Sequence, residues 1–201
     1  MFHPRQLLLI VTTTCLLSFS LAQANEASLV KEKCGTCHGD DGNSTHSKVP
    51  SIAGFSVDAL EDTLSMYKSD DRISEKYTPD GGKETNMNEI AKNLSEADTK
   101  TIITFLASQK FKPVKQNFDA ALAKQGKKIH EKKCEKCHSD NGTNSEDDAA
   151  ILAGQHRSYL EMQFKLIAAD KRDIPRKMKK RFKKLNDNEH KALIEFYISQ
   201  Q

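Results

Sequence analysis

The sequence predicts an all-α protein made of two tandem, homologous domains. The first observation is the motif Cys-x-x-Cys-His, which occurs at residues 34–38 and again at residues 134–138 of the 201-residue chain. The second is that apolar residues recur at helical spacing around both copies, whereas no convincing alternation of apolar and polar residues marks a strand. A chain of this length has room for one large domain or two small ones. Two helical units account for both observations.

The similarity between the halves extends well beyond the motif. The offset is 100 residues up to Arg72 and Arg172, and 91 residues from there on. The first unit therefore carries nine extra residues, which fall around Tyr77–Gly82, where the composition is typical of a surface loop. The matched pairs are Gly42 with Gly142, Ala53 with Ala153, Gly54 with Gly154, Met87 with Met178, Leu94 with Leu185, and Phe105 with Phe196.

Residues 1–24 read as a cleaved secretory signal peptide. Arg5 is followed by an apolar stretch over 7–22 and by the cleavage pattern Ala22-Gln23-Ala24. An uncleaved membrane anchor and lipidation at Cys15 are the less favoured alternatives. Cleavage removes Cys15 and leaves four cysteines. We expect a first domain over 25–108, a linker over 109–117 and a second domain over 118–201.

Helices are expected in matching places in each half. Periodicity predicts helices over 26–36 and about 118–136, which lead into the motifs, and second helices over 56–69 and 156–169. The last helix of each unit begins with a capping signal, at Ser95 in the first half and Asn186 in the second.

The motif Cys-x-x-Cys-His indicates covalent attachment of c-type haem. Two thiols at this spacing can form thioethers with the two vinyl groups of one porphyrin, and the adjacent imidazole can bind the iron. A zinc site would need further clustered ligands, and a thioredoxin-like redox pair would need a βαβ context; the sequence has neither. We therefore expect two covalent haem c groups. The attaching residues are Cys34, Cys37, Cys134 and Cys137, and the proximal ligands are His38 and His138.

Each iron also needs a sixth ligand or an open position. Met87 and Met178 occupy equivalent positions and are the predicted axial ligands; packing elsewhere is the alternative. Met66 and Met162 have no methionine counterpart and read as helix or core residues. The remaining histidines, His46, His130, His156 and His190, are expected to be solvated surface residues. Arg72 and Arg172 could each steady a haem propionate or simply lie solvated beside a loop.

Together these motifs resemble tandem class I cytochrome c domains, and in particular the dihaem cytochrome c4 family. The resemblance covers nearly all of the chain after residue 24. It implies two domains that each wrap round one covalent haem, with low-spin His/Met ligation and a two-fold-like interface between them. It also implies that the Pro50 backbone carbonyl orients the haem-binding histidine. The second half departs from this pattern, since Ala150 stands at the matching position.

The resemblance implies a periplasmic electron carrier rather than an enzyme. It would act between respiratory or dehydrogenase donors and a terminal acceptor such as an oxidase. One alternative is a dihaem subunit of a larger periplasmic dehydrogenase, for example a sulfide-oxidising flavoprotein. A dihaem peroxidase-type enzyme is another, and it would require one open iron position.

Charge is distributed unevenly along a polar chain in which 29% of residues are charged and the formal net charge is +3. Residues 25–113 contain 11 basic and 15 acidic side chains, whereas residues 114–201 contain 19 and 13. Basic residues fill most of the segment from Arg176 to Lys184, around Met178. We expect this basic segment to bind an acidic surface on redox partner proteins. Export excludes a nucleic-acid partner, and a loose association with the membrane surface stays open.

Overall fold

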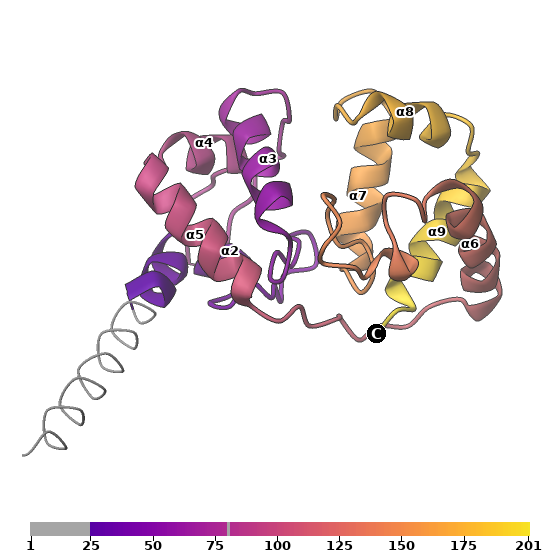
Figure 1. Cartoon of the computed structure of the whole chain (residues 1–201), viewed down its shortest axis with the longest axis horizontal. Coiled ribbons are helices and arrows are strands. Elements are labelled where there is room, and N and C mark those ends of the chain that lie inside the picture. Colours follow the sequence, from indigo (N-terminus) through magenta and orange to yellow (C-terminus); the bar gives the residue numbers. More distant parts are fainter. Residues whose placement is uncertain (1–24, 80) are drawn as a thin grey trace, which may run out of the picture.

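The computed structural model describes residues 25–79 and 81–201. It shows two helical halves side by side, joined by an extended segment along one edge (Figure 1). Extended pairing among the described residues is limited to two isolated bridges, Arg72 with Arg172 and Tyr77 with Thr85. The all-α prediction is confirmed. The predicted signal peptide, residues 1–24, lies outside the described residues.

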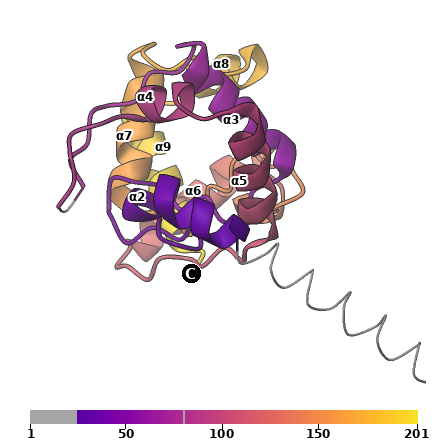
Figure 2. The same ribbon diagram turned by 90° about the vertical axis from the view of Figure 1, so that its left-hand side faces the viewer.

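The first half begins with α-helical residues 25–30, which continue through a π-helical turn and the short α2 into the first motif. Figure 2 looks onto this half, with its helices arranged around the middle of the domain. Its helical segments are η1 (Lys31–Gly35), α2 (Thr36–His38), α3 (Val57–Lys68), α4 (Met87–Lys92) and α5 (Glu96–Ser108).

The second half repeats this order with a regular α-helix before its motif. Its helical segments are α6 (Ala120–Lys133), η2 (Asp140–Gly142), α7 (Arg157–Ala168), α8 (Arg176–Phe182) and α9 (Asp187–Ile198). No helix among the residues that the structure describes is long and apolar enough to cross a membrane.

The predicted caps form as expected, because their side chains satisfy N–H groups that the first helical turn leaves unpaired. The Ser95 side chain accepts from the N–H of Asp98 at the start of α5. Asn186 and Glu189 form a reciprocal capping box at the start of α9. These caps fix where the last helix of each half begins, and both helices then bury their apolar faces in the core.

The methionine segments differ from the expectation. No helix was predicted at either methionine, but Met87 begins α4 and Met178 lies within α8. The basic run around Met178 is therefore mostly helical. Helices of six and seven residues are too short to display a convincing 3.6-residue period, so the pattern could not reveal them. The insertion in the first half does form a loop, which the Tyr77–Thr85 bridge closes.

The two halves meet through polar contacts and through α7. Gln155 accepts from the N–H of Ser51 (3.0 Å) and donates to the Ser51 carbonyl (2.7 Å). The His156 Nε2 atom donates to the carbonyl of Ser44 (2.9 Å). Gln155 and Ser51 are completely buried. This pairing satisfies backbone groups that would otherwise be buried without partners.

Candidate haem-binding sites

The first motif forms one side of a large cavity inside the first half. The cavity has a volume of about 410 Å³, within the range of about 300–1,000 Å³ that is usual for cofactor and ligand sites. Cys34, Cys37, His38 and Met87 all line it, and most of the remaining lining is apolar. The structure therefore brings all four predicted site residues of this half to one enclosed space.

Backbone geometry orients the His38 ring. Its Nδ1 atom lies 2.8 Å from the Pro50 carbonyl oxygen, which can only accept, so Nδ1 carries the proton and donates. Burial lowers the pKa of His38 more than this hydrogen bond raises it, so the imidazole is neutral. A neutral ring with its Nδ1 proton engaged leaves Nε2 as the metal-binding atom. The contact implied by the resemblance is present.

The two thiols of this site are held in their neutral form. Burial, with a smaller effect of the neighbouring Cys37, raises the pKa of Cys34 to about 11. Burial also raises the pKa of Cys37. Neither thiol is in a disulfide. Both are thus available for thioether bonds to a porphyrin that fills the cavity.

Met87 stands at the start of α4, where local hydrogen bonds fix its backbone. The Asn86 side chain caps the helix by accepting from Glu89 N–H (2.9 Å), and the N–H of Met87 donates to Ser74 Oγ (2.7 Å). Its thioether then lines the cavity that His38 also lines. A soft sulfur donor in this position suits haem iron.

The second motif follows α6 directly. Cys134 ends that helix and Cys137 is exposed. Burial and, next, the charge of His130 lower the pKa of His138, while Asp147 and the Ala150 carbonyl act in the opposite direction. The loop that contains Ala150 is held in the same way as its counterpart in the first half, although it lacks the proline. The N–H groups of Leu152 and Ala153 donate to the Gly142 carbonyl, as those of Ile52 and Ala53 do to Gly42.

Met178 lies within α8 and packs against an apolar cluster that contains Ile167, Ile174, Phe164 and Phe182. This places its side chain on the inner side of the helix that carries the basic run. Its role as an iron ligand stays a prediction, as does that of Met87.

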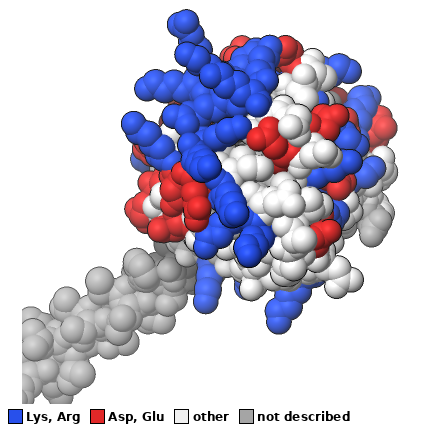
Figure 3. Space-filling view, turned by 90° about the vertical axis from the view of Figure 1, so that its right-hand side faces the viewer, with Lys and Arg blue, Asp and Glu red and all other residues white. Residues whose placement is uncertain are grey.

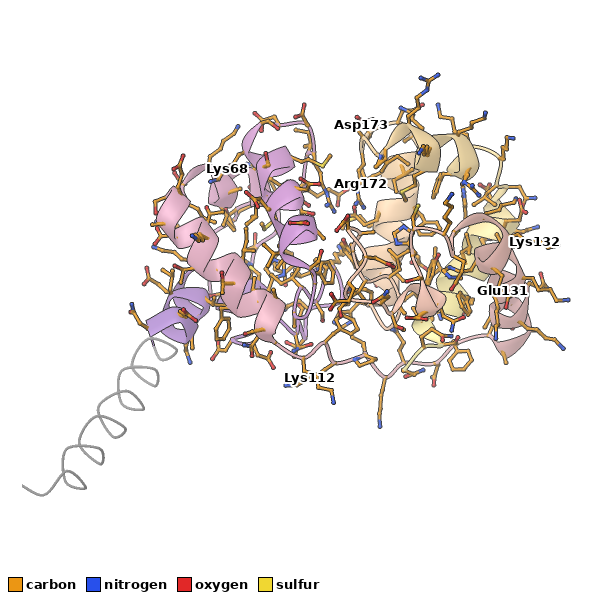
Figure 4. The ribbon with its side chains drawn as sticks, viewed as in Figure 1. Lys68, Lys112, Glu131, Lys132, Arg172 and Asp173 are labelled. Carbon is orange, nitrogen blue, oxygen red and sulfur yellow. The ribbon has the colours of Figure 1, made fainter. Side chains whose placement is uncertain are left out.

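Arg72 and Arg172 meet where the two halves join. The alternative that both are solvated side chains beside a loop is wrong. Their backbones form an antiparallel bridge, and both guanidinium groups donate to Gln163 Oε1 (3.3 and 2.5 Å). Arg72 is 6% exposed and lines the first cavity; its guanidinium also lies over the Tyr67 ring, 4.8 Å from the centroid. Figure 4 shows Arg172 on the side of the second half that faces the first.

This arginine pair lacks a negative partner among the described side chains, and Nε of Arg172 is buried without a hydrogen bond. Burial and, next, the positive charge of Arg72 lower the pKa of Arg172 to about 10. Two cations that share a neutral amide, one of them buried and the other half-buried, need an anion nearby. Carboxylate groups at the edge of a cofactor would supply one, so the pair fits haem with its propionates.

The four other histidines were expected to be solvated, and this was wrong. His130 is completely buried and His156 is 9% exposed, while His46 and His190 are half-buried. His46 Nδ1 lies 3.0 Å from the Tyr77 hydroxyl, and His190 stacks on Phe182 with ring centroids 4.4 Å apart. A signal for His130 did exist, since the repeat aligns it with the core residue Val30.

The comparisons with known proteins agree with this architecture. The Cytochrome c family model matches residues 24–110. Cytochrome c4 of Stutzerimonas stutzeri is 34% identical over 142 residues, which are 65% of this chain and 65% of that protein. The chain thus spans slightly less than two thirds of the length of the curated relatives that it matches, with 63–65% covered.

Solved structures match over more of the chain. The reduced recombinant cytochrome c4 from Pseudomonas stutzeri aligns with a TM-score of 0.69 and 26% identity, covering 90% of this chain and 98% of that one. A thiosulfate dehydrogenase from Marichromatium purpuratum shows a likeness of fold alone, with a TM-score of 0.69, 18% identity, and coverage of 88% of this chain and 40% of that one. The chain is thus similar to cytochrome c4 in both sequence and fold, and its two Cys-x-x-Cys-His motifs fit two covalently bound haem c groups.

Proposed function

We propose that this protein is a periplasmic electron carrier between respiratory or dehydrogenase donors and a terminal acceptor such as an oxidase. Haem c supplies a one-electron iron couple whose potential methionine ligation raises. In this proposal the four motif cysteines hold the two groups, His38 and His138 are the proximal ligands, and Met87 and Met178 are the distal ligands. Residues 1–24 would direct export.

The observation that carries the proposal is that His38 and Met87 line the same cavity. If both side chains ligate, the iron keeps no open position for a substrate, and the chemistry is confined to gaining and losing an electron. The surrounding residues then act by excluding water and by holding the ligands in place. Pro50 fixes the imidazole, and Asn86 fixes the helix that begins with Met87.

A basic surface on the second half supports a protein partner with an acidic docking face. Arg181 of α8 donates to the Lys133 carbonyl at the end of α6 (3.1 Å), so the two lysine-rich helices adjoin. Figure 3 shows the gathering of Lys and Arg on the side of the molecule that carries them. Lys179 and Lys183 pair with Asp170, while Lys177, Lys180 and Lys184 are exposed.

Replacing each proposed methionine ligand separately tests the function. Met87→Leu and Met178→Leu keep the apolar volume but remove the sulfur, so each should convert one haem of the two from low spin to high spin and lower its potential. Electron paramagnetic resonance and redox titration of the full-length holoprotein would measure both effects.

Met162→Leu is the matched control, because Met162 lines the same cavity from α7 but is not a proposed ligand. It should leave both haems low-spin. The proposal fails if the unmodified protein already contains one high-spin haem, since an open iron position would favour the peroxidase-type alternative.

A further inference from the structure

A buried polar cluster adjoins the second haem motif. His130 on α6 is completely buried, with its Nδ1 atom 3.0 Å from the Tyr197 hydroxyl and its Nε2 atom 2.5 Å from Glu135 Oε2. The Tyr197 hydroxyl is also close enough to Cys134 Sγ for each group to shift the pKa of the other. The cluster therefore runs from a carboxylate that is about 40% exposed, through an imidazole and a phenol, to a sulfur that carries haem.

The first half has no counterpart of this cluster. By the offset of the repeat, His130 aligns with Val30, Glu135 with Gly35, and Tyr197 with Leu106. Val30 and Leu106 are buried in the apolar core of the first half. Placing a histidine, a carboxylate and a phenol there costs desolvation energy, which packing by valine and leucine avoids. The second half thus has a buried polar network at positions where the first half has apolar residues or glycine.

Hydrogen-bond chemistry gives this network two states. An ionised Glu135 only accepts, so Nε2 of His130 must carry a proton, and in the neutral ring Nδ1 accepts from the Tyr197 hydroxyl. When Nδ1 gains a second proton, it donates to the Tyr197 oxygen instead. The single hydroxyl proton of Tyr197 is then free to turn towards Cys134 Sγ.

The groups around the cluster leave His130 as its central proton acceptor. Phe196 of α9 packs against the ring at a centroid distance of 5.2 Å, and Asp140 N–H donates to the second oxygen of Glu135 (3.1 Å). Burial raises the pKa of Tyr197 well above its usual value, so the phenol stays protonated. The other facing groups are Cys134, His138, Arg181 and the Lys133–Glu189 ion pair.

We propose that His130 is a proton-binding site coupled to electron transfer at the second haem, a further function that rests on the proposed electron-carrier role. One electron arrives from the protein's redox partner, and one proton arrives from solvent and binds Nδ1, the ring nitrogen that lacks a proton. The proton stays on Nδ1 while the site is reduced, and both leave on oxidation. The negative charge of the added electron favours a positive His130 ring and a Tyr197 hydroxyl directed at Cys134 Sγ. Reduction of the haem and protonation of His130 therefore favour each other.

The test is the pH dependence of each haem's reduction potential in the full-length holoprotein. Redox titrations between pH 5 and 8, followed by proton NMR, resolve the two haems through signals from their own motif segments. The potential of the second haem should fall as pH rises, by at most a tenfold change in the reduction equilibrium per pH unit, which is about 59 mV for one electron. His130→Val, which installs the residue of the first half, should abolish this slope.

Two further measurements keep the result interpretable. Glu135→Gln removes the carboxylate but keeps its size, and should weaken the slope; His46→Gln, beside the first motif, should leave it unchanged. In the unmodified protein, the NMR titration midpoint of the His130 ring should be higher in the reduced than in the oxidised state.

Equal His130 midpoints in both redox states, or a slope that persists in His130→Val, would overturn the inference and leave a structural network. That outcome would not touch the proposed function, which requires only two low-spin haems that accept electrons reversibly. Loss of that behaviour in the unmodified protein would instead refute the electron-carrier role itself.

Discussion

Glu195 ties the start of the second half to its last helix. Its carboxylate accepts hydrogen bonds from Arg157 through both oxygens and from the backbone N–H of Asp119 (2.8 Å). Asp119 in turn caps α6. Arg157 lowers the pKa of Glu195 most, burial opposes this, and the Asp119 N–H lowers the pKa further. One side chain therefore connects the segment before α6 with α7 and α9.

Glu195→Gln should destabilise the second half by about 1–2 kcal/mol at pH 7, because charge-assisted bonds are lost and Arg157 is one third exposed. The pKa of Glu195 is lower in the folded than in the unfolded chain, so its ionised form stabilises the folded state at pH values above the unfolded pKa of about 4.3. This stabilisation is lost as the pH falls through the folded-state pKa. Denaturant unfolding at pH 7 and below pH 4 measures it. An equal difference between wild type and variant at both pH values would contradict the pairing.

Individual residues show which structural features could be predicted from the sequence and which could not. Motif spacing and the repeat predicted that Cys34, Cys37, His38 and Met87 would share one site, and the family resemblance predicted the contact of His38 with the Pro50 carbonyl. Burial of His130 and the bonds of Gln155 to Ser51 could not be predicted, because they depend on contacts 67 and 104 residues away along the chain. The same holds for Arg72 and Arg172, whose environment exists only once the halves pack.

The contact between α6 and α9 depends on a glycine. A Cβ atom at Gly126 would lie 2.0 Å from the Ala192 carbonyl oxygen and 2.7 Å from the Cβ of Phe196. The two helices therefore approach so closely that no larger residue fits between their backbones. Helical periodicity predicted both helices but not this approach, since a glycine within a helix normally only weakens it.

Gly126→Ala should destabilise the second half by about 1–3 kcal/mol, since the backbone of α9 has to move. In a domain of this size each kcal/mol lowers Tm by about 4–8 °C, which calorimetry would detect. The control is Gly35→Ala, another helical glycine, where the Cβ would meet only the flexible Asp40 side chain (2.7 Å). If the two variants have the same Tm, the close approach is not a constraint.

At the scale of the whole molecule, the halves differ in charge, and helix α7 of the second half forms part of the wall of the cavity in the first half. The excess of basic residues lies in the second half and concentrates on α6 and α8. The cavity of the first half is partly lined by Tyr159, Met162 and Leu166 of α7. The repeat predicts that the two halves have similar folds, but it does not predict which surfaces of the two halves pack against each other.

Neutralising exposed lysines of α8 tests the docking surface. The triple change of Lys177, Lys180 and Lys184 to Gln should slow reaction with the physiological partner and flatten its ionic-strength dependence. Steering by such a surface raises association rates by about 10–10³ and weakens as salt shortens the Debye length to about 8 Å. Stopped-flow kinetics over a salt series measures both.

Lys179→Gln with Lys183→Gln is the comparison, because Asp170 already offsets these two lysines. It should slow the reaction less, and the spectra of both haems should be unchanged in each variant. If the triple variant keeps the full rate and salt slope, docking takes place elsewhere.

The shared wall makes the first half an incomplete module. A gene fragment that encoded only the residues before the linker would produce a cavity open along the side that α7 covers, with Arg72 deprived of Gln163. Recombination with a related gene could exchange this half alone only if the incoming half also matched the residues of α7 that line the cavity. A substitution on the face of α7 that lines this cavity would therefore change the first half as well as the second, even though the sequence still displays two separate repeats.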